Sequence, residues 1–408
     1  MPYRILHVIS SVNPQGGGPI EGLSQLAAVN RRHGHQVEIL SLDDPHEPFV
    51  RQCPVPCHAM GPTRMRGYRY TPRLTEWLKA HRHDYDLVII NGIWQYHAFG
   101  AWRALRGTGT PYFVFIHGML DPWFKRNYPF KHLKKWLFWP WAEYRVLRDA
   151  TSVMFTCEDE RRLARQSFWL YRCREFVVNY GTSAPPTDAD AQRTAFASRF
   201  PNLTATRNLL FLGRVHEKKG ADLLLRAFAD VLRDDPARLK DVRLVMAGPA
   251  DHPYGQRMQA LAQELGLAQH VFWTGMLRGE LKWGAFRAAD AFILPSHQEN
   301  FGIAVAEALA CGVPVLISNQ VNIWREIDAS GAGLVEPDDL AGTRRLIERW
   351  LDQPQAAWQA MKTRAAQCFH ERFLIDRTFE SVMAAMALHG IQERPVRPAL
   401  SEELVGAE

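Results

Sequence analysis

The sequence lacks a long hydrophobic run, and this absence limits the classes of protein to which the chain can belong. None of its apolar stretches reaches the ~18 residues that a membrane-spanning helix needs. The first residues also lack the apolar segment and the small-residue cleavage site of a secretory signal. Six cysteines are scattered over 408 residues, which is typical of reduced thiols. We therefore expect a cytoplasmic protein.

Metal-binding patterns are also missing. Cys53 and Cys57 form a C-x3-C pair, but no second Cys or His pair nearby completes a zinc site. No Asp-x-Asp pair lies near the carboxyl end of an expected strand. The sequence therefore predicts no metal site and no required cofactor.

The composition is that of a folded protein with more than one domain. Apolar residues make up 47% and charged residues 23% of the 408 positions, so the chain can bury full cores. This length favours two or three domains. The net charge of +6 is spread over many residues and suggests an anionic partner without identifying it. We expect no nucleic-acid partner.

Short apolar strands alternate with amphipathic helices along the chain. The alternation predicts an α/β fold with doubly wound parallel sheets. The Pro-, Ala- and Asp-rich stretch 182–190 is the best linker candidate. We expect two Rossmann-like domains, 1–185 and 186–370, and then a segment, 371–408, with a helix that returns to the first domain and a flexible tail. The expected strands are 3–10, 37–42, 87–91, 112–116, 153–156, 176–179, 208–212, 242–247, 270–273, 291–294, 313–317 and 331–335.

Three consecutive glycines, Gly16, Gly17 and Gly18, follow the first expected strand and precede a helix over 20–30. A strand, a glycine loop and a helix N-terminus together form a phosphate-binding geometry. Their spacing does not fit G-x-G-x-x-G, so a dinucleotide fingerprint is not supported. A tight turn without a ligand is the alternative.

Two glutamates flank a helix start in the stretch 297–318, HQENFGIAVAEALACGVPVLIS. Asn300 is the expected N-cap, with Glu299 before the helix and Glu307 inside it. The two glutamates are eight residues apart, which on a helical rise is roughly 12 Å. The helix N-terminus between the two carboxylates favours an anion. A nucleotide-diphosphate sugar has the matching order of hydroxyls, diphosphate and ribose hydroxyls. The alternative is that both glutamates simply lie on a solvated face.

Basic residues follow another strand end, in Gly213-Arg214-Val215-His216-Glu217-Lys218-Lys219-Gly220. Arg214 and Lys219 can converge on one diphosphate, with Lys218 as the next candidate. A solvated basic turn is the alternative. His117 ends the strand 112–116, at the sheet edge where open α/β folds bind ligands, although a lone histidine is more often structural.

The residues Glu299-Asn300-Phe301-Gly302 and Glu307 together resemble the E-x7-E signature of retaining glycosyltransferase family 4 of the bacterial polysaccharide type. Arg325-Glu326-Ile327 and 333–338 extend the resemblance over 208–350, while the first half matches only loosely. The resemblance implies the GT-B fold, in which two Rossmann-like domains face each other across a cleft. It also implies transfer of a hexose from a nucleotide-diphosphate sugar, a GDP- or UDP-sugar, to an acceptor hydroxyl with retention.

The resemblance assigns roles to particular residues. The implied catalytic residues are Glu299, His117, Arg214 and Lys219. The implied donor-binding residues are Gly16, Gly17, Gly18, Arg214, Lys219, Asn300, Phe301, Gly302 and Glu307. Two other classes remain open: an epimerase or phosphorylase of the same architecture, and a nucleotide-sugar binding protein without catalysis.

The segment 122–148 interleaves Lys and Arg with Trp, Phe and Tyr. This composition suits an anionic membrane surface, and the implied acceptor is a glycan or a lipid-linked saccharide. The chain would then be peripheral on the inner face of the plasma membrane. In the alternative, Trp136, Leu137, Phe138 and Trp141 pack as core and leave Lys131, Lys134, Lys135 and Arg145 as a solvated face.

Overall fold

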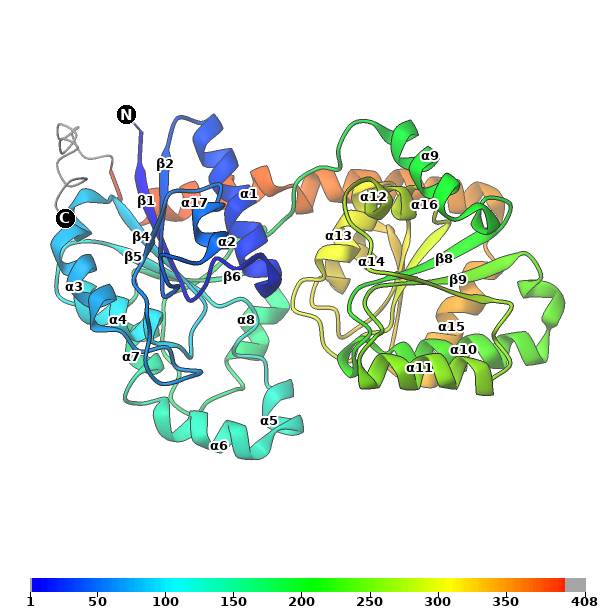
Figure 1. Ribbon diagram of the computed structural model, residues 1–408, viewed down its shortest axis with the longest axis horizontal. Coiled ribbons are helices and arrows are strands. Elements are labelled where there is room, and N and C mark those ends of the chain that lie inside the picture. Colours follow the sequence, from blue (N-terminus) through cyan, green and yellow to red (C-terminus); the bar gives the residue numbers. More distant parts are fainter. Residues whose placement is uncertain (1, 393–408) are drawn as a thin grey trace.

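The apolar strands form two separate parallel sheets, and helices cover both faces of each sheet (Figure 1). The structure is a computed structural model that describes residues 2–392. Strands in such sheets are buried on both sides and therefore consist of continuous hydrophobic runs. Residues 87–90, for example, are at most 1% exposed. The predicted α/β fold with two Rossmann-like domains is confirmed.

The first domain has a seven-stranded sheet of order β3-β2-β1-β4-β5-β6-β7, and all its neighbouring strands are parallel. Its strands are β1 Arg4–Ile9, β2 Gln36–Ser41, β3 Cys57–Ala59, β4 Leu87–Asn91, β5 Tyr112–Phe115, β6 Ser152–Phe155 and β7 Glu175–Val177. Its helices are α1 Gly18–Arg32, α2 Pro48–Arg51, α3 Pro72–His81, α4 Tyr96–Leu105, α5 Trp123–Asn127, α6 Pro129–Phe138, α7 Glu143–Asp149 and α8 Glu158–Ala164.

The second domain repeats this topology in a six-stranded sheet of order β10-β9-β8-β11-β12-β13. Its strands are β8 Arg207–Leu212, β9 Val242–Ala247, β10 Val271–Gly275, β11 Ala291–Leu294, β12 Val315–Ser318 and β13 Gly333–Glu336. Its helices are α9 Ala189–Arg199, α10 Ala221–Asp234, α11 Pro253–Glu264, α12 Gly279–Arg287, α13 Ile303–Ala310, α14 Trp324–Ser330, α15 Leu340–Leu351 and α16 Gln355–Cys368.

Each sheet has one point where the strand order reverses. It lies between β1 and β4 in the first domain and between β8 and β11 in the second. Open α/β sheets bind ligands in the crevice beyond the carboxyl ends of the strands at such a point. The loops after β1, β8 and β11 are therefore the places where a site is expected.

The chain passes between the domains twice, and the two passages are hydrogen-bonded to each other. The Thr182 amide donates to the Phe373 carbonyl oxygen at 2.9 Å, and the Ile375 amide donates to the Thr182 carbonyl oxygen at 3.0 Å. The final helix, α17 (Ile375–Leu388), then packs on α1 of the first domain through Leu26, Val29, Ile375 and Phe379. In Figure 1 this last part of the chain runs back from the second domain to the first. The tail expected at the end of 371–408 lies, from residue 393 on, outside the described residues.

The aromatic and basic segment 122–148 is folded into α5, α6 and α7 at the lower edge of the first domain (Figure 1). The core alternative for its four apolar residues is wrong: Trp136, Leu137, Phe138 and Trp141 are 38–67% exposed. Trp139, between them, is the residue that is fully buried. Within residues 2–392 no helix is long and apolar enough to cross a membrane.

Replacing Gly181 by alanine tests the paired passages between the domains. A Cβ atom on Gly181 would lie 2.3 Å from the Phe373 carbonyl oxygen, so the backbone must shift. We expect Gly181→Ala to lower the melting temperature by at least ~3 °C, the effect of about 1 kcal/mol in a domain of this size. Gly109→Ala is the matched control, because its Cβ would meet nothing within 4 Å. Equal melting temperatures for the two variants in thermal unfolding would contradict this account of the crossing.

Candidate active site

Loops from the carboxyl ends of both sheets meet between the two domains. The Asn300 side-chain amide, after β11, donates to Thr156 Oγ1, after β6, at 3.2 Å. The Gln298 amide donates to the Asp121 carboxylate at 3.0 Å. A Cβ atom on Gly118, which follows β5, would lie 2.7 Å from the Asn300 side chain. The candidate site therefore has walls from both domains.

Glu299 is held in place by two backbone hydrogen bonds as well as by its side chain. Its amide donates to the Gln320 carbonyl oxygen and its carbonyl oxygen accepts from the Asn322 amide, both at 3.0 Å. Its carboxylate forms an ion pair with the ammonium group of Lys219. Lys219 comes from the β8–α10 loop and Glu299 from the β11–α13 loop, so the pair lies at the point where the strand order reverses.

Gly302, not Asn300, caps the start of α13, so the expected N-cap is wrong. The helix begins at Ile303, and Gly302 has the left-handed φ of 79° that glycine adopts without strain. Asn300 lies too early to cap the first turn and is used in the contact with Thr156 instead. The first turn of α13 still lies close to Glu299, because only two residues, Asn300 and Phe301, separate Glu299 from Gly302 in sequence.

Lys219 is a partly buried cation of the β8–α10 loop with a side chain that is 23% exposed, while Lys218 turns toward the first domain. The left-handed Gly220 lets this loop approach the Pro295 carbonyl oxygen, which a Cβ atom would meet at 2.1 Å. Burial lowers the pKa of Lys219 to about 8, and the nearby cations Arg214 and Lys218 act in the same direction. The Lys218 ammonium lies over the Trp123 and Phe124 rings of the first domain, 4.3 Å and 4.1 Å from the ring centroids. The geometry therefore favours Lys219 over Lys218 as the cation available to an anion in the site. Arg214 is exposed and lies close to Lys219.

Glu307 is the second carboxylate, and the structure gives it a partner that the sequence did not indicate. The side chain is 5% exposed and accepts from Lys282 Nζ of α12 at 2.5 Å. Burial raises the pKa of Glu307, and the Lys282 ammonium opposes this rise. A single lysine on an amphipathic helix gives no sequence signal for such a role. Each glutamate of the pair thus has its own lysine.

His117 lies at the end of β5 in a strained backbone conformation, with φ of 51°. Its ring stacks on Phe115 at 4.5 Å, and its Nε2 lies 3.3 Å from the Asn91 side-chain oxygen. Burial lowers the pKa of His117 to about 3, with His7 acting in the same direction. The imidazole is therefore neutral at physiological pH and can donate or accept a hydrogen bond, but it is not a charged acid.

The glycine loop of the first domain lies next to the first turn of α13. A Cβ atom on Gly18 would lie 3.3 Å from Ile303 Cδ1, in the first turn of α13. Gly17 has φ of 79°, and a Cβ atom added to Gly16 or Gly17 would meet no other group within 4 Å. Their backbone amides donate to the Asn13 and Pro14 carbonyl oxygens at 2.9 Å and 3.3 Å, so both are used within the loop.

Phe301 differs from the other expected donor-binding residues because its side chain points into the protein. It is 4% exposed and packs against Tyr180 and Phe373, with ring centroids 5.0 Å and 5.7 Å apart. It can offer a ligand only backbone atoms. Tyr180, which the sequence pattern left without a role, lies between Phe301 and His117.

Among residues 2–392 no three His, Cys, Asp or Glu side chains are grouped to hold a metal ion.

Comparison with known families identifies the class of protein. Residues 17–181 match the family model described as "Glycosyl transferase 4-like domain" and residues 196–367 match "Glycosyl transferases group 1". The two matches lie one after the other and together cover most of the chain, domain by domain. The chain therefore belongs to the group 1 glycosyltransferases.

Individual relatives and solved structures agree with this class. A D-inositol 3-phosphate glycosyltransferase of Geodermatophilus obscurus is 30% identical over 255 residues, which are 60% of this chain and 54% of the relative. The chain thus matches about half the length of that relative. Sucrose-phosphate synthase from Thermosynechococcus elongatus has a TM-score of 0.74 at 19% identity and covers 95% of this chain and 100% of its own. Anabaena HepE in complex with UDP and glucose has a TM-score of 0.71 at 16% identity, with 94% and 99% covered. The fold is GT-B.

The lowered pKa of Lys219 predicts a pH-dependent affinity for an anion such as UDP. Below pH of about 8 the free protein carries this charge, so the Kd should be flat; above it the ammonium is lost and the Kd should rise. Lys219→Arg keeps its charge throughout and should abolish the rise. Calorimetric titrations from about pH 7 to about pH 9.5 measure both proteins. A rise of the same size in both would show that another group is responsible.

Proposed function

We propose that this glycosyltransferase moves a hexose from a nucleotide-diphosphate sugar to an acceptor hydroxyl with retention of configuration. The observation that carries the proposal is the ion pair between Lys219 and Glu299 at the N-terminal end of α13. In this proposal Lys219 is the cation for a diphosphate and Glu299 is the acceptor for sugar hydroxyls, and the two side chains are in contact where the strand order of the sheet reverses. HepE, which shares the fold, is described with bound UDP and glucose, and this supports a UDP- or GDP-sugar donor.

Donor binding would exchange partners within this pair. The diphosphate takes the Lys219 ammonium, Arg214 and the free amides of α13, and Glu299 is released to accept from the sugar hydroxyls. Glu307, inside α13, accepts from the ribose hydroxyls. Arg214 and Lys219 then stabilise the charge that develops on the leaving diphosphate, which is an electrostatic contribution to catalysis.

The attacking hydroxyl loses its proton to the departing diphosphate in this scheme. No covalent enzyme intermediate is required, so the two glutamates do not act as the carboxylate pair of a glycoside hydrolase. His117 remains neutral and lies on the first-domain side, where it can hold the transferred sugar by a hydrogen bond. The reaction needs groups from both domains, because Glu299 and His117 belong to different ones.

Arg214→Ala tests the role of the exposed arginine. Removing one positioned contact to a developing anion costs about 3 kcal/mol in comparable sites, so we expect turnover to fall about 100-fold. Arg257→Ala is the control, because Arg257 is an exposed arginine of α11 that pairs with Glu217. Steady-state release of the nucleoside diphosphate measures both variants. Wild-type turnover in Arg214→Ala would remove this residue from the diphosphate site.

The two glutamates should respond differently to substitution by glutamine. The ribose contact is the same before and during the reaction, so Glu307→Gln should weaken binding of the bare nucleotide about tenfold. Glu299→Gln should leave this affinity within about twofold and lower turnover instead, since its contact lies beside the reacting carbon. Calorimetry with UDP or GDP and steady-state kinetics separate the two effects. An equal loss of nucleotide affinity in both variants contradicts the division of roles.

We further propose that the acceptor is a lipid-linked saccharide, reached at the inner face of the plasma membrane. Phe130, Leu133 and Leu137 lie on one side of α6 at helical spacing, and they are 88%, 56% and 61% exposed. Residues 122–142 contain no acidic side chain, and Lys131 and Lys134 are exposed beside the apolar side. This combination of apolar and basic groups suits insertion among anionic headgroups. Lys135 does not belong to that surface, because its ammonium lies 4.4 Å from the Trp94 ring centroid.

Vesicle co-sedimentation tests the membrane proposal. We expect the wild type to bind vesicles that contain phosphatidylglycerol, and Phe130→Asp with Leu137→Asp to reduce binding at least about tenfold. Leu388→Asp is the control, because Leu388 is 70% exposed on α17. Lys131→Glu with Lys134→Glu should weaken binding most at low salt. Failure of the wild type to bind, or unchanged binding in the α6 variants, would favour a soluble acceptor.

A further inference from the structure

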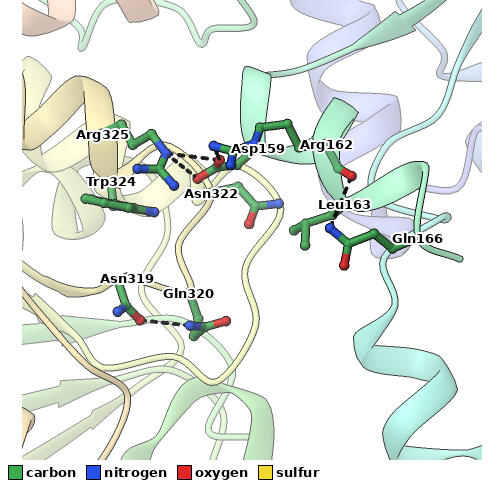
Figure 2. A pocket seen from close by; sticks show the side chains of 9 residues that line it. All are labelled: Asp159, Arg162, Leu163, Gln166, Asn319, Gln320, Asn322, Trp324 and Arg325. Carbon is green, nitrogen blue, oxygen red and sulfur yellow. Dashed lines mark hydrogen bonds and ion pairs between the residues drawn. The ribbon is translucent and has the colours of Figure 1, made fainter.

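A cavity of about 290 Å³ lies between α8 of the first domain and the loop 319–323, which joins β12 to α14, of the second domain (Figure 2). Its volume is at the lower end of the range for small-molecule sites, which corresponds to a ligand of about one ring. Figure 2 shows side chains from both domains around it. None of its lining residues belongs to the donor-binding or catalytic set described above.

The polar lining of the cavity consists largely of side-chain amides. Asn319, Gln320 and Asn322 come from the loop of the second domain, and Gln166 comes from the segment after α8. An amide both donates and accepts hydrogen bonds, and a sugar hydroxyl does the same. A row of amides can therefore satisfy a ring of hydroxyls without a net charge.

Trp324 adds an apolar platform to this polar lining. One face of its indole is covered by the Arg325 guanidinium, 4.1 Å from the ring centroid. In Figure 2 the indole is seen nearly edge-on, with Arg325 on one side and the Asn319–Gln320 pair on the other. An indole supplies a large rigid apolar surface next to polar groups, which suits the face of a sugar ring.

Asn322 has a buried donor without a partner. The residue is 6% exposed, and its side-chain nitrogen has no hydrogen-bond acceptor among the residues that the structure describes. Buried polar groups are almost always paired, and an exception requires an explanation. Figure 2 shows this side chain extending from the loop into the space in front of α8. This nitrogen has almost no accessible surface, so a hydroxyl bound in the cavity would become its partner after a rotation of the side-chain amide.

An ion pair between the domains fixes the two walls of the cavity. Arg325 Nε of α14 donates to both carboxylate oxygens of Asp159 in α8, at 3.1 Å and 3.2 Å. Arg162 Nη1 also lies 3.5 Å from Asp159. The carboxylate is thus neutralised within the protein. The cavity exists in this form only while the two domains are together.

The loop of the cavity is also the loop that holds Glu299. The Glu299 amide donates to the Gln320 carbonyl oxygen, and the Asn322 amide donates to the Glu299 carbonyl oxygen. The cavity is therefore linked through its own loop to the backbone of Glu299, the residue proposed to hold the transferred sugar. We propose that it is an acceptor subsite that binds one sugar ring of the acceptor saccharide. This assignment rests on the proposed function.

Binding of soluble sugars to the full chain tests the subsite. The probes are the methyl glycosides of glucose, galactose, mannose, N-acetylglucosamine and glucuronic acid, each titrated in the presence of saturating UDP and followed by saturation-transfer NMR. We expect at least one glycoside to bind the wild type. Trp324→Ala and Asn322→Leu should each weaken that binding at least about tenfold. Trp169→Ala is the matched control, because Trp169 is a tryptophan that is 65% exposed outside the cavity lining.

The affinity for UDP, measured on the same proteins, separates this proposal from the proposed function. We expect it to stay within about twofold in all these variants, because the donor contacts are unchanged. Gln166→Ala changes the wall of the cavity on the α8 side and should also weaken glycoside binding. Such a loss could not be caused by a distortion of the loop 319–323, which forms the other wall. No glycoside bound by the wild type, or equal binding in the wild type and the three cavity variants, overturns the subsite. Failure of the wild type to bind any nucleoside diphosphate would instead overturn the proposed function.

Discussion

Two largely buried glutamates must be compensated, and this requirement determines how the second domain is built around its site. Glu299 and Glu307 are paired with Lys219 and Lys282, and all four come from separate elements of the domain. A buried carboxylate without a partner is strongly destabilising, so loops that are distant in sequence must converge. The strand order β10-β9-β8-β11-β12-β13 brings the loops after β8 and β11 together at the point where it reverses. The topology and the ion pairs therefore depend on each other.

The same region joins the domains. Asn300, immediately after Glu299, contacts Thr156, and Lys218, immediately before Lys219, lies over Trp123 of α5. The residues that would bind the donor are thus adjacent in sequence to residues that contact the first domain. A change in the position of one domain would therefore shift the residues that are proposed to bind the diphosphate. The paired crossings at Thr182 and Leu374 are the natural place for such a movement, because the backbone passes between the domains there.

Much of this architecture follows from the sequence because hydrophobic period and glycine position are local signals. The strands β4, β9 and β11 have the predicted bounds, since each is a largely apolar run between turn residues, interrupted in β9 by Arg243. The strand β3 was missed because three residues at a sheet edge are too short to show a period. The cap at Asn300 was assigned wrongly because a contact with Thr156 in the other domain competes for its side chain, and no local pattern reveals that contact.

The site was predictable to the extent that its chemistry lies in one stretch of sequence. The sequence placed Glu299 before a helix and Glu307 inside it, with the wrong cap for that helix, but Lys282 is a partner that only the tertiary structure supplies. The composition of α6 could not show whether its apolar residues are exposed or packed in the core, because tryptophan, leucine and phenylalanine occur in both settings. The pattern also gave no sign of Asn322 or Trp324, since the cavity that they line needs α8 of the other domain.

In the proposed mechanism Lys219, Arg214 and the first turn of α13 form the site for the diphosphate. Calorimetric titration of the wild type with a nucleoside diphosphate and with the corresponding monophosphate measures this directly. Because the second phosphate adds charge-assisted contacts, we expect UDP or GDP to bind at least about tenfold more tightly than UMP or GMP. Equal affinity for the diphosphate and the monophosphate of both bases would contradict the account.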